Sequence, residues 1–129
     1  MSSELEVLAV YGLVIILTIV LQVLATLPQY DLSYLVGPRD QTRELNGLAG
    51  RLARASTNNV TALAYFAPAV LVTPVHGQTT AAALLAAQIF LFARIVYVGF
   101  YALGVPWLRT ISWGIGLVSA IYLYGVALL

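Results

Sequence analysis

Hydrophobic residues dominate four stretches of the chain, at residues 7–27, 55–73, 79–103 and 108–129. Each stretch approaches the roughly 20 apolar residues that a helix needs to cross a bilayer. Turn-forming residues interrupt the apolar pattern at positions 73–78 and 104–106, where a helix is expected to stop. The pattern predicts an all-α membrane protein, a bundle of four transmembrane helices at about residues 5–27, 42–73, 79–103 and 107–129.

Composition supports a membrane location and limits the number of domains. The 129 residues are 61% hydrophobic and 9% charged, with a mean hydropathy of +0.94, which is far from the composition of soluble domains. We therefore expect a single transmembrane domain over residues 1–129. A net charge of +1 gives no sign of nucleic-acid binding, and the absence of cysteine excludes disulfides and thiolate metal sites. No metal is expected.

The charged residues predict which way the helices cross the membrane. Glu4 and Glu6 precede the first apolar stretch, in place of the basic residues of a cleaved signal peptide, so this stretch is expected to remain as a helix. The positive-inside rule places the arginine-bearing connections in the cytoplasm and both termini on the other side. We expect a multi-pass protein of a bacterial inner membrane. The arginines of the two connections are Arg39, Arg43, Arg51, Arg54 and Arg109.

The connection between the first two predicted helices is long for so small a protein. Residues 28–50 include aromatic residues and arginines. Long connections of this kind often carry a function, and this one is a candidate lid.

Arg94 lies inside an apolar stretch, where a guanidinium is costly and rarely kept without a function. Three kinds of partner remain open: neutral groups, loop carboxylates that fold inward, or an anion from outside the chain. No acidic residue falls inside an apolar stretch; the acids of the chain are Glu4, Glu6, Asp31, Asp40 and Glu44.

Two sets of polar residues recur at helical spacing and should face protein rather than lipid. If the two sets face each other, they form a pocket suited to a small anion that carries carboxylates. Taken singly, most of these residues are also explained as helix bridges or interfacial anchors, whereas the group around Arg94 favours a function. The sets are Arg51, Arg54, Asn58, Thr61 and Tyr65, and Arg94, Tyr97 and Tyr101.

Three segments resemble the MAPEG family, the membrane-associated proteins in eicosanoid and glutathione metabolism. The segment 51–58, Arg-Leu-Ala-Arg-Ala-Ser-Thr-Asn, is similar to the family motif Arg-Ala-x-x-Asn-x-x-Glu. The segment 92–101 is similar to the motif Ala-Arg-x-x-Tyr-x-x-x-Tyr, and residues 104–113 resemble the family's entry into the last helix. The resemblance extends over nearly the whole chain.

The resemblance implies a homotrimer that binds glutathione between neighbouring subunits. It also implies that Arg109 faces the glutathione sulfur. One position departs from the family motif: Thr61 stands where the motif has glutamate, which weakens the expectation of glutathione binding and leaves the pocket more positive. The candidate binding residues are Arg51, Arg54, Asn58, Thr61, Arg94, Tyr97 and Tyr101.

The leading functional hypothesis is a glutathione-dependent membrane transferase or peroxidase. It would act on lipophilic electrophiles that arrive through the bilayer, with a glutathione thiolate activated by Arg109. Two alternatives stay open: a non-catalytic protein of the same fold that binds an anionic lipid or metabolite, and a structural membrane subunit. A transporter is less well supported, because no predicted span contains the acidic residue of a proton or sodium relay.

Overall fold

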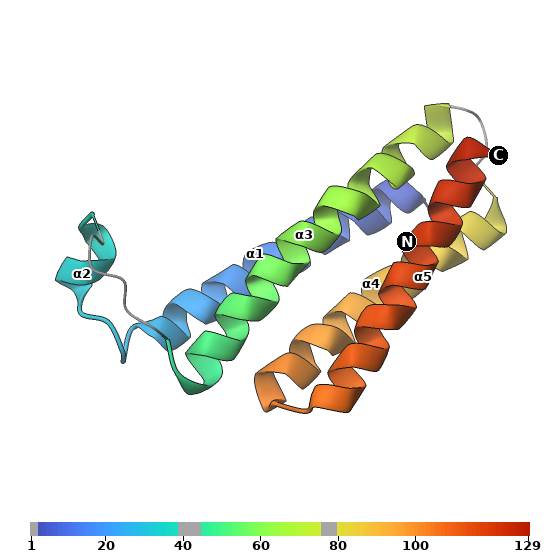
Figure 1. Ribbon diagram of the computed structural model, residues 1–129. Helices are drawn as coiled ribbons and strands as arrows, with labels where there is room; N and C mark the ends of the chain where they lie inside the picture. Colours follow the sequence, from blue (N-terminus) through green and yellow to red (C-terminus); the bar gives the residue numbers. More distant parts are fainter. Residues whose placement is uncertain (1–2, 39–44, 76–79) are drawn as a thin grey trace.

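A computed structural model describes residues 3–38, 45–75 and 80–129, and this part of the chain is helical without strands. Four long helices, α1 (Glu4–Thr26), α3 (Gly47–Val75), α4 (Ala81–Leu103) and α5 (Pro106–Leu128), form the bundle, and α2 (Leu32–Val36) is a single short turn. Helix α3 packs against α1, α4 and α5, and α4 packs extensively along α5 (Figure 1). Helices α3 and α4 each contact all the other long helices of the bundle.

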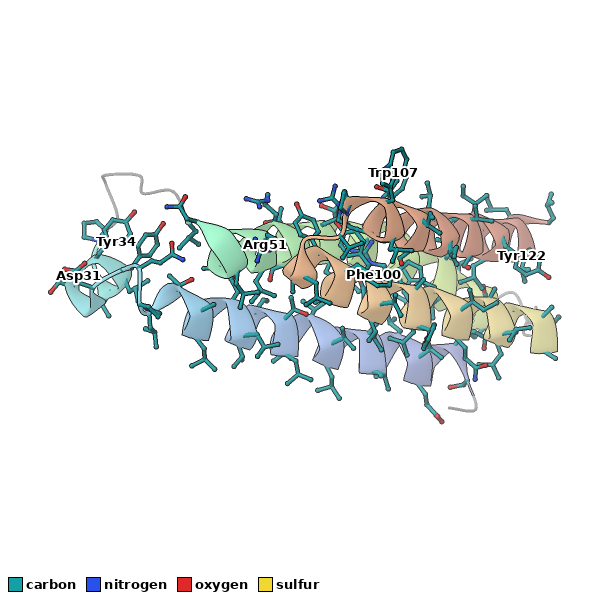
Figure 2. The ribbon with its side chains drawn as sticks, turned by 90° about the horizontal axis from the view of Figure 1, so that it is seen from below. Asp31, Tyr34, Arg51, Phe100, Trp107 and Tyr122 are labelled. Atoms are coloured by element: carbon teal, nitrogen blue, oxygen red, sulfur yellow. The ribbon has the colours of Figure 1, made fainter. Side chains whose placement is uncertain are left out.

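The helices alternate in direction, so the chain begins and ends at the same end of the bundle (Figure 1). The α4–α5 turn and the connection from α1 to α3 lie toward the opposite end, and α2 extends beyond it (Figure 2). The four long helices make an even number of passes along the bundle, which brings the beginning and the end of the chain to the same end.

Three of the described helices are long and apolar enough to cross a membrane: α1, α4 and α5. The sequence predicted four spans, and α3 is the exception. Its 29 residues exceed the length required, but Arg51, Arg54, Asn58 and Asn59 reduce its apolar character. Helix α3 is a fourth long helix packed beside the three apolar ones.

The start of α3 differs from the prediction of a helix from about residue 42. Asn46 is not helical, and α3 begins at Gly47, whose φ of 61° is left-handed. The side chain of Gln29 holds this start in place, because its Nε2 donates to the Asn46 carbonyl (2.8 Å) and its Oε1 accepts from the Asn46 amide (2.9 Å). Residues 39–44, part of the candidate lid, lie outside the described residues, and the short helix α2 was not predicted.

Capping and turn residues explain the ends of α4 and the start of α5. Thr80 caps the start of α4, with its hydroxyl accepting from the Ala83 amide. Gly104 ends it in the left-handed conformation, with φ of 75°, and the Val105 amide donates to the Phe100 carbonyl at 3.0 Å, the pattern of a Schellman motif. Pro106 then opens α5, so the two helices reverse direction within a few residues.

Aromatic rings fill the centre of the bundle. Phe66 of α3 and Phe90 of α4 stack at 3.9 Å with an interplanar angle of 8°. Tyr11 of α1 lies edge-on to both rings, at 5.9 and 5.2 Å. Alanines around these rings, such as Ala62 and Ala87, are buried and let the helices approach closely. This packing fixes the faces of α1, α3 and α4 that meet at the site.

Candidate functional site

Arg94 is fully buried at the centre of the site, with 0% of its surface exposed. Its Nε donates to Asn59 Oδ1 (3.0 Å), and its Nη2 donates to Asn59 Oδ1 (2.6 Å) and Asn58 Oδ1 (2.7 Å). The guanidinium carbon lies 4.2 Å from the centre of the Tyr97 ring, which favours a cation. Of the three kinds of partner left open by the sequence, the described residues therefore supply neutral groups: two amide oxygens and an aromatic face.

A glycine on the neighbouring helix packs beside this arginine. A Cβ built on Gly116 of α5 would lie 3.5 Å from the Cδ of Arg94. The side chain of Arg94 is thus enclosed by three helices, α3, α4 and α5. One of its nitrogens, Nη1, is buried without a hydrogen-bond partner.

Tyr101 connects the same three helices one turn further along α4. Its ring packs edge-on against Tyr97 at 5.6 Å. Its hydroxyl accepts from Nε of Arg54 in α3 at 3.1 Å, and the guanidinium carbon of Arg109 in α5 lies 4.6 Å from its ring centre. Two tyrosine rings therefore link three arginines: Arg94 on one side, and Arg54 and Arg109 on the other.

A cavity of about 270 Å³ lies beside these rings, between α3, α4 and α5. Four of its lining residues were predicted from the sequence as site residues. The other two, Thr110 and Trp113 of α5, were not. The short α4–α5 turn is what sets the first turn of α5 beside Tyr101. The lining residues are Asn58, Tyr97, Tyr101, Arg109, Thr110 and Trp113.

Four of the predicted binding residues do not line this cavity: Arg54 and Arg94 contact residues that do, whereas Arg51 and Thr61 have other partners. The Nε of Arg51, which is labelled in Figure 2, donates to the carbonyl of Ala102 at 2.9 Å, and so satisfies a carbonyl in the last turn of α4. Thr61 is exposed, and its hydroxyl donates to the Thr57 carbonyl of its own helix at 3.1 Å. Within the chain, the structure therefore brings together Arg54, Asn58, Arg94, Tyr97, Tyr101 and Arg109, and leaves Arg51 and Thr61 apart.

Two polar residues at the core of the site were not predicted. Asn59 holds Arg94, and the hydroxyl of Tyr11 donates to both the carbonyl and Oδ1 of Asn59 at 3.0 Å. The sequence contained a signal for Asn59, because Asn59 is polar and the other residues on its helical face, Ala55, Ala62 and Phe66, are small or apolar. Tyr11 gave a weaker signal as an aromatic residue within an aliphatic helix.

The described carboxylates lie away from the cavity. Glu4 and Glu6 belong to the first turn of α1, at the end of the bundle where the chain begins, and Asp31 precedes α2. None of the cavity's lining residues is acidic. The cavity therefore presents a guanidinium, an amide and phenols in a partly desolvated setting, which suits an anionic ligand. The described residues contain no group of side chains able to hold a metal ion.

The apolar helices and their arrangement define an integral, multi-pass membrane protein of the all-α class, with a cationic cavity lined by tyrosines. The model of the MAPEG family matches residues 7–129, and the chain therefore belongs to the MAPEG family. This match confirms the resemblance found in the three sequence segments. No curated protein and no solved structure matches the chain significantly.

Proposed function

We propose that this protein is a glutathione-dependent membrane transferase or peroxidase that acts on lipophilic electrophiles. Membership of the MAPEG family supports this class of activity. The observation that carries the proposal is the convergence of Arg54, Arg94 and Arg109 on the Tyr97–Tyr101 pair. Glutathione has two carboxylates, and arginine offers the planar donor pairs that bind carboxylates in two-point contacts.

The proposed roles follow from where each side chain lies. Arg54, Asn58, Tyr97 and Tyr101 bind the glutathione backbone and its carboxylates. Arg109 lies in the first turn of α5 and faces the sulfur. A nearby cation favours the thiolate over the thiol, and the N-terminal end of a helix adds a favourable field.

We further propose that the active assembly is a homotrimer with the ligand between subunits. A cavity of about 270 Å³ in one subunit is slightly smaller than the roughly 300–1,000 Å³ of typical ligand pockets. Arg54 and Thr61 of α3 are exposed in the single chain, as expected of residues that meet a ligand or a neighbour. A second subunit would enlarge the site and bring these residues to it.

The membrane supplies the second substrate in this proposal. A separate cavity of about 290 Å³ lies between α4 and α5, and its walls include Ile89, Phe92 and Ile115, which are exposed and apolar. Surfaces of this kind accommodate membrane lipid and lipophilic small molecules. We also propose that both termini lie on the non-cytoplasmic side, so that the arginine-rich end of the bundle faces the glutathione of the cytoplasm.

Binding and conjugation assays on the purified protein in nanodiscs test the proposal. We expect glutathione to bind, to show the ultraviolet absorbance of a thiolate when bound, and to react with an aryl halide. S-methylglutathione, which has no thiol, is the control for the absorbance. Binding without thiolate formation or conjugation would favour a non-catalytic binding protein, and no binding would favour a structural subunit.

A further inference from the structure

One amide oxygen is the meeting point of three helices. Oδ1 of Asn59 in α3 accepts hydrogen bonds from two nitrogens of Arg94 in α4 and from the hydroxyl of Tyr11 in α1. Asn59 and Tyr11 are both 0% exposed. All three donors point at the oxygen, so the orientation of this amide is set by its partners. Asn59 therefore fixes the position of Arg94, and Asn59 does not itself line the cavity.

Arg94 does not line the cavity, but it contacts two residues that do. Its Nη2 donates to Asn58, and its guanidinium lies over Tyr97, and both of these residues line the cavity. A shift of Arg94 would therefore displace an amide and a phenol that face the ligand.

The partners of Arg94 position it without neutralising it. Asn58 and Asn59 are uncharged, and among the described residues no carboxylate reaches the guanidinium. Charges act strongly over short distances where water is excluded. The full positive charge of Arg94 thus remains available to an anion in the cavity, whereas an aspartate at position 59 would cancel it.

We propose that Asn59, supported by Tyr11, is a positioning residue that holds Arg94 behind the cavity wall while leaving its charge uncancelled, and so selects for an anionic ligand. This inference rests on the proposed glutathione site. A purely structural role predicts that any good acceptor at position 59 is sufficient. The positioning role predicts that an acceptor with a negative charge preserves the structure and weakens ligand binding.

The variants Asn59→Asp and Asn59→Leu separate these two roles. Asn59→Asp keeps the acceptor and adds a charge, and Asn59→Leu removes the acceptor at similar size. The Nε–H signal of Arg94, observed by nitrogen-15 NMR of arginine-labelled protein and assigned with Arg94→Lys, reports whether the guanidinium is still held. Glutathione affinity, measured by calorimetry in nanodiscs, reports the effect on the ligand.

For Asn59→Asp, we expect a protected Arg94 Nε–H signal, a thermal midpoint equal to or above that of the wild type, and glutathione affinity weakened about fivefold or more. For Asn59→Leu, we expect loss of the protected signal and loss of affinity. Tyr11→Phe keeps the ring packing and removes the hydroxyl, and should give a smaller loss of protection.

Unchanged glutathione affinity in a well-folded Asn59→Asp would overturn the proposal, as would a protected Nε–H signal in Asn59→Leu. If the wild type fails to bind glutathione, the proposed function fails instead. The NMR signal would then still decide, on its own, whether Asn59 positions Arg94.

Discussion

Arg94 shows how a buried cation is held without an acidic partner. Removing a charge from water is costly unless hydrogen bonds and other charges or dipoles replace the lost hydration. Three hydrogen bonds to Asn58 and Asn59 replace part of the lost hydration. The contact of a desolvated cation with a tyrosine ring adds about 2 kcal/mol of stabilisation. The arginine, the two amides and the ring therefore depend on one another.

The first prediction at the residue scale concerns Arg109. We expect Arg109→Ala to lower kcat for glutathione conjugation about a hundredfold or more, corresponding to a loss of roughly 3–4 kcal/mol of transition-state stabilisation. Glutathione affinity should fall much less, because the contact strengthens as the thiolate forms. Steady-state kinetics and calorimetry on the same preparation measure the two effects.

The variant Arg109→Lys is the matched control, because it keeps a positive charge near the sulfur. It should recover part of the lost rate. Equal losses in binding and turnover for Arg109→Ala would contradict the assignment of Arg109 to the thiolate.

A second residue-scale prediction concerns Thr61, where the family motif has glutamate. Thr61→Glu should strengthen glutathione binding about fivefold, since an exposed ion pair with the ligand's ammonium contributes up to about 1 kcal/mol. Thr57→Glu is the control: Thr57 lies one turn earlier, is also exposed, and has its hydroxyl bonded to the Ala53 carbonyl. Weaker binding by Thr61→Glu alone would indicate a site adapted to a more anionic ligand.

Most residues that the structure brings together around Arg94 were grouped from the sequence, whereas Asn59 and Tyr11 were missed. Spacing grouped Arg54 and Asn58 and, separately, Arg94, Tyr97 and Tyr101. It did not separate the roles of Asn58 and Asn59, which are adjacent and point about 100° apart on the helix. Both contact Arg94, but only Asn58 also lines the cavity; this division depends on the rotation of α3 against α1, and the largely apolar sequence of α1 does not fix that rotation.

At the scale of elements, the α4–α5 turn determines the geometry of the cavity. Gly104 has a φ of 75°, a conformation that costs other residues roughly 1–2 kcal/mol. We expect Gly104→Ala to lower the thermal midpoint and to weaken ligand binding, because the turn sets Arg109 beside Tyr101. Thermal unfolding and calorimetry in the same detergent are the measurements.

Gly114→Ala provides the control for this substitution. Gly114 is helical, and nothing lies within 4 Å of the position its Cβ would occupy. The change should therefore be neutral or slightly stabilising. A Gly104→Ala variant as stable as Gly114→Ala would show that the turn tolerates a side chain.

The order of the long helices was predictable, whereas the first connection was not. Apolar length predicted α1, α4 and α5, and the residues at 104–106 predicted the turn. The start of α3 at Gly47 depends on the contact of Gln29 with Asn46, 17 positions away. Local sequence patterns do not report a pairing at that distance. The short helix α2 lies in the same connection, and no periodic pattern of apolar residues predicted it.

At the scale of the whole molecule, assembly is the main prediction. We expect native mass spectrometry in mild detergent to show three copies of the 13.9 kDa chain. Ala64→Trp should weaken this assembly, because Ala64 is exposed on α3 near Thr61 and a bulky ring there would obstruct a neighbouring subunit. A monomer or dimer of the wild type that persists across a dilution series would contradict the trimer.

Both ends of the chain emerge at the same end of the bundle, and the α4–α5 turn beside the cavity lies toward the other (Figures 1 and 2). This has a practical consequence for handling the protein. An affinity tag, a fluorophore or a surface linker on either terminus would therefore sit at the end of the bundle away from the α4–α5 turn. Immobilised through its C-terminus on a sensor surface, the protein should therefore keep its cavity open to ligands in the flowing solution.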